Sequence, residues 1–376
     1  MEKNTIQEWS LLLFPFSLSL PVSLKVKSIT LVVFFLILLM NFKWKNFKFE
    51  KNCLYNLVFT LFISLFLVEI LIGLLTENRV LFHEVRLSFL IAPILFYVSG
   101  KSLIRYKEKI LASFIVGVFV YVFYSIGFIF YFYFIQGSSK PFEFNYYLKY
   151  VLYNYMPGAM HHTYIGMYAC FALTIILIFS QVNWYKKLII SIPLLLLMPF
   201  IGSKTSLFVT VIVILVWLTR EFSVRILKWV VPFIVALALS ILLYTDIFRT
   251  FSNSFKVRLS LLKCTFEGIG ENFMFGIGRD EIKTFLATCT KGLYEMDTHN
   301  MYVQELLSSG ILSLVILILL LGATLKLLKN NLLAIMFLCM FMVFGVFEHL
   351  LNMQLGVTYF VFFSMCFVVF TTELKK

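Results

Sequence analysis

The sequence predicts an all-α protein that crosses a membrane many times. Hydrophobic residues make up 61% of its 376 residues and charged residues 14%, whereas roughly a quarter of a soluble domain is charged. Apolar segments of about 16 to 25 residues recur along the chain, as membrane-spanning helices require. Segments such as 28–40 and 188–200 lack the alternation of a barrel strand, so their backbone hydrogen bonds must be made within helices.

We expect one transmembrane domain, 1–376, with about twelve spanning helices. The first resembles a signal peptide, but Lys25 and Lys27 follow it without a small-residue cleavage site, so we expect it to be retained. The predicted spans are 8–24, 28–42, 53–76, 86–100, 110–136, 161–181, 188–202, 205–219, 229–245, 301–325, 331–348 and 352–371.

Lysine and arginine are concentrated in alternate connections, counted from the N-terminal tail. The positive-inside rule places these connections, and therefore both termini, in the cytoplasm. The longest loop, 246–300, then faces outward. On this topology the net charge of +13 reflects orientation and anionic lipid rather than nucleic-acid binding.

Two outward segments are large enough to form a site. The first, 136–160, is rich in tyrosine and leads into His161 and His162. Its aromatic residues suit either the membrane interface or stacking on sugar rings, and both interpretations stay open. Because adjacent residues of a helix face different ways, we expect at most one of the two histidines to line a common site.

The second segment is the long loop 246–300. Its portion 255–267 has the spacing of an amphipathic helix lying along the membrane surface, with an end expected at 268–272, a tight turn at Gly276 and Gly278, and a further helix at 280–288. The apolar positions of the first helix are Phe255, Leu259, Leu262 and Phe266.

Cysteine usage leaves one question open. Cys264 and Cys289 share the outward loop, where an oxidising compartment permits a disulfide, but sequence does not give their separation. The other cysteines, in or beside predicted spans, are interpreted as small apolar residues: Cys53, Cys170, Cys339 and Cys366.

Three residues are candidates for chemistry. His299 stands at the start of the predicted helix 301–325, where Thr298 or Asn300 can cap the helix, and its imidazole can act as a general base. Lys204 follows a break between two apolar helices, and Arg258 lies on the amphipathic helix; both suit an anion. The alternatives are an interfacial histidine, a lysine extended to the headgroups and an arginine bound to lipid.

Ionisable residues near the predicted spans are expected to be paired. We expect a structural pair between Arg86 and either Glu69 or Glu348, next to His349. The acidic residues of the loop could bind a divalent ion, but their spacing does not require one. They balance the basic residues of the loop, so we expect a solvated surface of mixed charge and no metal ion. These acids are Asp280, Glu281, Glu295 and Asp297.

Four motifs in order resemble the O-antigen ligase and polymerase superfamily of bacterial envelope glycosyltransferases. They are a break between spans, an arginine on an outward amphipathic helix, a turn of the Asn-Pro-Leu-Phe-Gly-x-Gly kind, and a His-Asn before a leucine-rich helix with a late glycine. Here they are Ser203-Lys204-Thr205, Arg258, the segment 272–278, and His299-Asn300 with Gly310. The match covers 200–325 and extends loosely over the chain. Lysine replaces the usual arginine at 204, and Phe273 replaces proline.

The resemblance implies a GT-C-like fold in the bacterial inner membrane. It implies metal-independent, inverting transfer of a glycan from undecaprenyl diphosphate at the periplasmic face, without a cofactor. Lys204, Arg258 and Asn300 would bind the diphosphate and His299 would be the base, with Arg86, His161, His162 and Glu348 as supporting residues. The acceptor would be lipid A-core for a ligase or a second carrier-linked glycan for a polymerase. A polysaccharide flippase is a third expectation, although polar residues along the spans are sparse.

Overall fold

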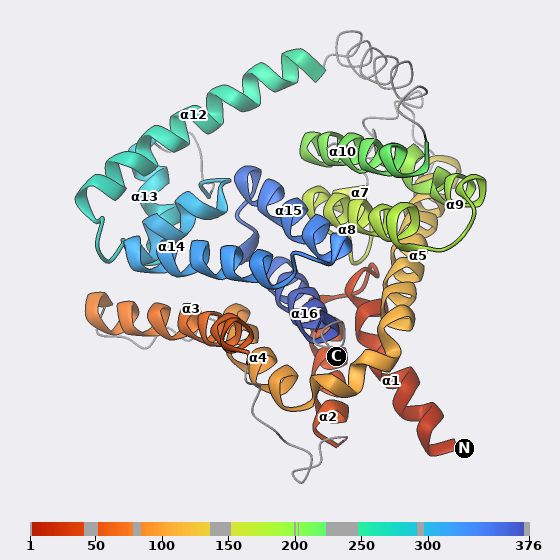
Figure 1. The fold of residues 1–376 in the computed structure, drawn as a ribbon. Helices are drawn as coiled ribbons and strands as arrows, with labels where there is room; N and C mark the ends of the chain where they lie inside the picture. The colour runs from red at the N-terminus through yellow and green to blue at the C-terminus, as the bar shows by residue number, and fades with distance from the viewer. Residues whose placement is uncertain are drawn as a thin grey trace.

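The structure is a computed structural model that describes residues 2–40, 52–77, 84–135, 152–198, 201, 203–222, 247–291 and 297–371. Over these ranges the regular secondary structure is helical, and they contain no strand. The elongated helix α12 (Ile247–Glu271) crosses one side of the molecule. The C-terminal end of the chain lies near the middle of the molecule (Figure 1). The all-α prediction is therefore confirmed for the described residues.

The described residues in the first half of the chain are mostly helical. The helices are α1 (Glu2–Leu18), α2 (Leu24–Met40), α3 (Cys53–Glu77), α4 (Ser88–Ser99), α5 (Lys107–Phe134), α7 (Leu152–Tyr155), α8 (His162–Thr174, continued by a π-helical turn at Ile175–Phe179), α9 (Trp184–Leu197) and α10 (Lys204–Glu221). Two 3₁₀ segments, Glu84–Arg86 and Gly100–Tyr106, flank α4.

The second half contains the helices of the predicted outward loop and the helices that follow it. After α12 come α13 (Glu281–Cys289), α14 (Met301–Leu327), α15 (Leu332–Phe347) and α16 (Gln354–Thr371), with a 3₁₀ turn at Leu350–Asn352 between the last two. Helix α14 packs along α3, and α15 packs against both α8 and α14. The link between α15 and α16 thus lies among helices from both halves of the chain.

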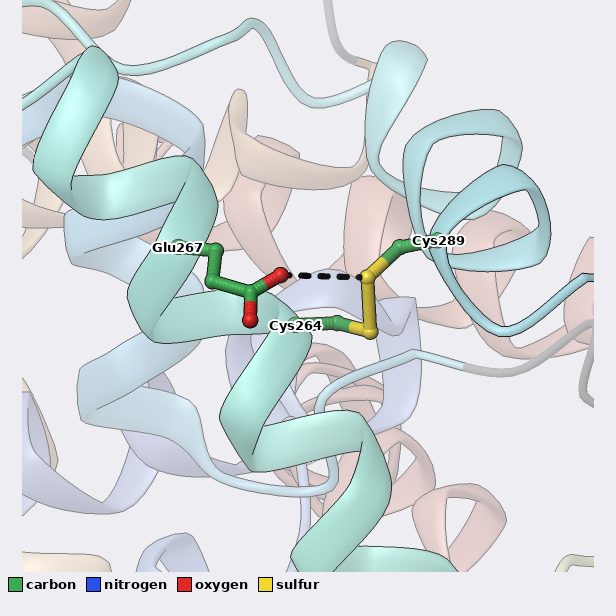
Figure 2. Close-up of side chains that lie close together, drawn as sticks. All are labelled: Cys264, Glu267 and Cys289. Atoms are coloured by element: carbon green, nitrogen blue, oxygen red, sulfur yellow. Dashed lines mark hydrogen bonds between the residues drawn. A yellow bond between two sulfur atoms is a disulfide. The ribbon is translucent and has the colours of Figure 1, made fainter.

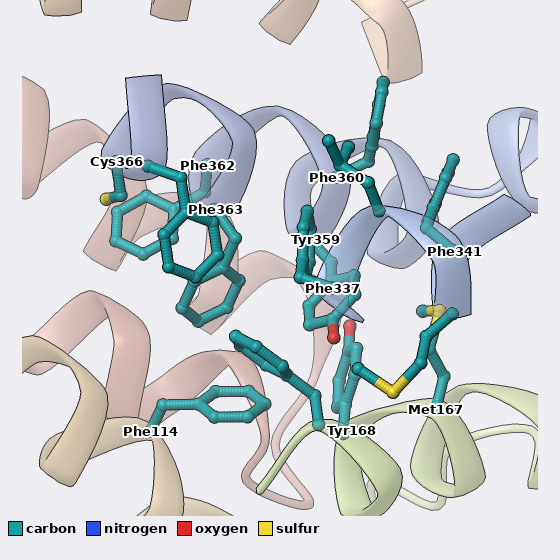
Figure 3. Close-up of a cluster of buried hydrophobic side chains, with 14 of the residues drawn as sticks. Phe114, Met167, Tyr168, Phe337, Phe341, Tyr359, Phe360, Phe362, Phe363 and Cys366 are labelled. Carbon is teal, nitrogen blue, oxygen red and sulfur yellow. The ribbon is translucent and has the colours of Figure 1, made fainter. Parts of the chain in front are cut away.

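Helix α16 is the central element of the core. Every residue from Gly356 to Thr371 is buried, as expected of a helix that is hydrophobic all round. Its aromatic side chains interlock with Phe114 of α5, Tyr168 of α8 and Phe337 of α15 (Figure 3). These edge-to-face and tilted contacts hold the helices around α16 in fixed positions.

Among the described residues, five helical segments are long and apolar enough to cross a membrane: Cys53–Leu75, Ser88–Phe134, His162–Phe179, Met301–Leu327 and Gln354–Thr371. Two shorter apolar helices, Glu8–Leu18 and Leu332–Phe347, lie below that length. Each predicted span overlaps a helix except 229–245, which lies outside the described residues, although some bounds differ by several residues, as for α1 and α9. The structure is thus compatible with a membrane protein.

The predicted features of the outward loop can be compared helix by helix. Helix α12 ends at Glu271, within the expected 268–272, and α13 occupies the expected 280–288 with a shift of one residue. The apolar stripe of α12 differs from the prediction, because Leu259 and Phe266 are exposed whereas Leu261 and Ile269 are buried. The helix therefore has two apolar faces, one packed on the protein and one open.

Candidate functional site

His299 is held in an unusual backbone conformation immediately before α14. Its φ is +52°, in the left-handed region that residues other than glycine rarely adopt. Asn300 is the N-cap of α14, and its side chain accepts hydrogen bonds from the backbone N–H groups of Tyr302 and Val303. The left-handed turn costs about 1 to 3 kcal/mol. Its presence beside a capped helix indicates that the position of the imidazole is constrained.

Glu348 is the centre of the contacts around His299. It follows α15, and its Oε1 lies 3.2 Å from His299 Nδ1 and 2.9 Å from His349 Nδ1. Its Oε2 accepts a hydrogen bond from the Thr163 hydroxyl at 3.1 Å. Burial opposes the charged carboxylate, but the two neighbouring imidazoles outweigh burial and hold the pKa of Glu348 well below its usual range.

Further histidines surround this carboxylate. His349 Nε2 lies 3.2 Å from Asp297 Oδ2, so both nitrogens of its ring face a carboxylate. His161 is close enough to interact electrostatically with Glu348, His299 and His349, and burial lowers its pKa. The adjacent His162 is exposed. Four of the chain's five histidines thus lie in one region, which we call the histidine cluster: His161, His299, His349, Glu348 and Asp297, with His162 at its edge.

Two helices begin at the histidine cluster, and the first turn of a third helix packs against one of them. Helix α14 begins next to His299, and α8 begins at His162, one residue before the Thr163 that donates to Glu348. Helix α10 begins at Lys204, and a Cβ built on Gly166 of α8 would overlap Ser206 in the first turn of α10. Helix N-termini carry partial positive charge, so these helix starts, together with Lys204, favour an anion.

Helix α14 is broken at Gly310, which has a φ of +69°. The backbone N–H groups of Ile277 and Gly278 donate to Leu307 and Ser308 carbonyls at 2.8 and 3.1 Å, in the place of helical partners. Gly276 also has a positive φ of +73° at this close approach. The glycine turn at Gly276 and Gly278 therefore packs directly against the break at Gly310 of α14.

Four buried charged side chains contact one another, and we call them the charge quartet: Glu69, Arg86, Arg279 and Glu305. Arg86 makes a two-pronged contact with Glu305 of α14, through Nη1 at 3.0 Å and through Nη2, and it lies 3.6 Å from Glu69 of α3. Arg279 contacts Glu69 at 2.9 Å and Glu305 at 3.3 Å. Burial and the neighbouring Arg86 lower the pKa of Arg279, against the effect of the carboxylates. Two positive and two negative side chains balance one another.

The charge quartet also fixes the link that carries Glu348. Arg86 Nε and Arg279 Nη1 each donate to the Leu351 carbonyl at 3.3 Å, and Arg279 also donates to the Asn352 side chain. Leu351 and Asn352 are three and four residues beyond Glu348. The two arginines therefore hold the segment that presents Glu348 to His299.

Helices α12 and α13 pack over the first half of α14, and we call them the cover. Arg258 and the disulfide belong to this cover. Cys264 and Cys289 are joined by a disulfide, which ties α12 to α13 (Figure 2). Glu267 Oε2 lies 3.6 Å from Cys289 Sγ. Half-buried Arg258 follows Val257, which packs with Leu261 and with Leu307 of α14 in one hydrophobic cluster. The helix that carries Arg258 thus lies against the first half of α14.

The predicted site residues fall into three groups. His299, Glu348 and His161 are brought together, and Lys204 begins α10, whose first turn packs on Gly166 of α8. Arg86 pairs with Glu69 as expected, but the expected alternative partner Glu348 faces His299 and His349 instead. The side chain of Asn300 caps α14 and donates to the Val346 carbonyl at 3.1 Å, which gives it a structural role.

Four residues were not expected to belong to the site. Glu305 and Arg279 complete the charge quartet, and His349 and Asp297 complete the histidine cluster. The solvated role expected of the loop acids is wrong for Asp297, which contacts His349, whereas Asp280 and Glu281 are exposed as expected. Glu295 lies outside the described residues. An acid inside a predicted span was the available signal for Glu305.

The histidine cluster has the donor atoms of a metal site. One ligand atom each from His299, Glu348 and His349 lie within 4.8 Å of one another. Cys264, Glu267 and Cys289 also lie close together, but the two sulfurs are joined to each other and offer no thiolate.

Comparison with models of known protein families gives no match, and comparison with curated proteins gives none either. A functional assignment therefore depends on the chemistry of the histidine cluster and of the helix starts around it.

Proposed function

We propose that the protein is a metal-independent, inverting glycosyltransferase of the O-antigen ligase type. It would transfer a glycan from undecaprenyl diphosphate to lipid A-core at the periplasmic face of the bacterial inner membrane. The observation that carries the proposal is the His299–Glu348 contact at 3.2 Å, which lies beside the N-termini of α8 and α14. A GT-C-like arrangement of about twelve spans, with cytoplasmic termini, is part of the same proposal.

The reaction requires a base for the acceptor and cations for the leaving group. Glu348 Oε1 accepts a hydrogen bond from His299 Nδ1–H, which leaves the Nε2 lone pair for the proton of the acceptor hydroxyl. The acceptor oxygen then bonds to the anomeric carbon as the bond from that carbon to the diphosphate oxygen breaks. The diphosphate leaves on its lipid carrier with both bonding electrons, and inversion follows from the single displacement.

Lys204 and Arg258 would neutralise the departing diphosphate. Lys204 supplies a positive charge at the N-terminus of α10, where the partial positive charge of the helix end adds to it. Arg258 approaches from the covering helix α12, which packs on α14. The exposed apolar residues Leu259 and Phe266 of α12 suit contact with lipid, where the carrier's tail would lie.

The first test is transfer by the purified protein in liposomes that contain the diphosphate-linked donor and lipid A-core. His299→Ala should lower kcat by roughly 10²- to 10⁴-fold, as removal of a general base does. Glu348→Gln should lower kcat by between roughly 10-fold and 10⁴-fold, because the base loses its orienting anion. Asp280→Asn alters an exposed acid of the same loop and should leave kcat unchanged. Full activity of His299→Ala would refute the assignment.

A second test addresses the diphosphate. Lys204→Ala should weaken turnover of the diphosphate-linked donor at least ~10-fold, whereas Lys204→Arg keeps the positive charge and should retain most of it. The same comparison applies to Arg258→Ala and Arg258→Lys. If either alanine variant keeps full activity at limiting donor concentration, that residue does not bind the diphosphate.

The acceptor is tested in a deletion strain. A ligase predicts loss of all long chains from lipid A with accumulation of carrier-linked polymer. A single repeat unit on the core would instead identify a polymerase, which uses a second carrier-linked glycan as its acceptor. The segment 136–160, suggested as an acceptor surface, lies for its larger part outside the described residues.

A further inference from the structure

The histidine cluster has an unbalanced negative charge when its imidazoles are neutral. Glu348 and Asp297 are two carboxylates, and His349 faces both of them, through Nδ1 at 2.9 Å and Nε2 at 3.2 Å. A neutral imidazole donates from one nitrogen only, so the other nitrogen turns a lone pair toward an anion. Consistent with this, the buried Nδ1 of His349 makes no hydrogen bond within the described part of the chain. The cluster therefore requires added positive charge, as protons or as a cation.

The donor atoms match a borderline-soft divalent cation. Two imidazole nitrogens and one carboxylate are the ligands of many catalytic zinc sites, which leave a fourth position open. Tetrahedral ligands at about 2.0 to 2.2 Å from zinc lie roughly 3.4 Å from one another. Glu348 Oε1 is already 3.2 Å from His299 Nδ1 and 2.9 Å from His349 Nδ1. Small side-chain movements are enough to admit an ion.

The surrounding residues are placed as supports for metal ligands. A ligating histidine normally donates its other N–H to a carboxylate, and Asp297 lies at that position on His349. A ligating carboxylate is normally hydrogen-bonded through its second oxygen, and Thr163 donates to Glu348 Oε2 at 3.1 Å. The charge quartet fixes the link between Glu348 and Asn352 through hydrogen bonds to Leu351 and Asn352. The ligands are thus preorganised.

We propose that His299, Glu348 and His349 bind one divalent transition-metal ion, with zinc the best fit, and that the bound ion holds the protein inactive. The ion replaces the proton on His299 Nδ1 and occupies the carboxylate that orients the base. It also withdraws electron density from the ring, so Nε2 becomes a poorer proton acceptor. Inhibition rests on the proposed transferase function, whereas binding of the ion does not.

Binding is tested with zinc chloride and the metal-stripped, full-length protein in detergent, by equilibrium dialysis and metal analysis without any donor. One zinc per chain is expected. His349→Ala and Glu348→Gln should weaken binding at least ~100-fold, and Asp297→Asn ~10- to 100-fold. Two controls should bind zinc normally: Asp280→Asn and the double variant Cys264→Ser/Cys289→Ser. The second control shows that the cysteines are not the ligands.

Cobalt provides a measurement that a merely structural defect does not mimic. Cobalt(II) bound by nitrogen and oxygen ligands in a low-coordinate site gives visible absorption bands, and these bands should be absent in His349→Ala. Thermal unfolding of each variant without metal identifies any that fail to fold. Absence of stoichiometric zinc, or zinc binding unchanged in both His349→Ala and Glu348→Gln, would overturn the metal site.

Inhibition is tested on the unsubstituted protein in liposomes. Saturating zinc should lower transfer at least ~10-fold, and a chelator should restore it. Undiminished transfer with zinc bound would overturn the inhibitory role. The two hypotheses fail separately: transfer without zinc binding removes the metal site alone, and zinc binding without transfer under any condition removes the proposed function alone.

Discussion

Gly310 is constrained both by its backbone conformation and by close packing against another segment. Its φ of +69° is rarely adopted by other residues, and an added Cβ would overlap the Met274 carbonyl. We predict that Gly310→Ala destabilises the protein by roughly 2 to 4 kcal/mol, because strain and overlap act together. Thermal unfolding in detergent measures the loss.

Gly322 gives a matched control in the same helix. A Cβ added there meets no atom within 4 Å, so Gly322→Ala should be neutral or stabilise α14 by up to about 1 kcal/mol. Equal unfolding midpoints for the two variants would show that the break at Gly310 does not contribute to stability.

At the scale of single residues, the sequence pointed to His299 more readily than to the residues around it. His299 was found because a histidine begins a long apolar helix, and Arg86 because a cation lies at the edge of a span. Arg279 was not found, because it follows a glycine turn in a loop rich in other basic residues. Its burial beside Glu69 and Glu305 depends on how α3, α14 and the turn pack, which residue spacing does not encode.

At the scale of elements, α12 and α13 form a cover fastened by the Cys264–Cys289 disulfide. Removal of a bond that closes a loop of this size is expected to destabilise the protein by about 3 kcal/mol. We predict a lower unfolding midpoint for Cys264→Ser/Cys289→Ser, and a similar decrease for the unsubstituted protein under reducing conditions. Reducing agent should have no further effect on the double variant.

The same disulfide tests the orientation of the loop. In intact spheroplasts, a membrane-impermeant maleimide should label Cys264 and Cys289 only after reduction, since an oxidising compartment maintains the bond. Labelling before reduction would mean that the bond does not form in the cell. Exposed Cys53 lies at the other end of the proposed topology and should stay unlabelled until the membrane is opened.

Helices were predictable where apolar segments are long, and less so where packing decides. The extents of α3, α14 and α16 follow from hydrophobic runs, whose backbone groups pair within the helix. The break in α14 was not foreseen, since its carbonyls are bonded by the distant residues Ile277 and Gly278. Helix α12 has one buried and one exposed apolar face. The spacing of apolar residues in the sequence identified only the exposed face, which contains Leu259 and Phe266.

At the scale of the whole molecule, the charge quartet joins segments that are far apart in the chain. Glu69 lies on α3, Arg86 precedes α4, Arg279 follows the glycine turn and Glu305 lies on α14. Their hydrogen bonds reach Leu351, so the quartet also positions the link between α15 and α16. Both α3 and α14 contribute an acid, and the connections contribute the arginines.

This arrangement predicts non-additive substitutions. Arg86→Met leaves two carboxylates with one arginine, and Glu305→Gln leaves two arginines with one carboxylate. Each single variant should therefore lose about 3 to 5 kcal/mol, as expected when one partner of a buried ion pair is removed. The double variant Arg86→Met/Glu305→Gln keeps Arg279 and Glu69, which lie 2.9 Å apart, so its remaining charges are balanced.

A double-mutant cycle in thermal or denaturant unfolding measures the coupling between Arg86 and Glu305. We expect the double variant to be less destabilised than the sum of the single variants by at least ~2 kcal/mol. Lys109→Met/Glu8→Gln, at a mostly exposed ion pair, is the matched control and should show coupling below about 1 kcal/mol. Additive losses at Arg86 and Glu305 would mean that the quartet does not act as one unit, and Glu348 would then depend on α15 and α16 alone for its position.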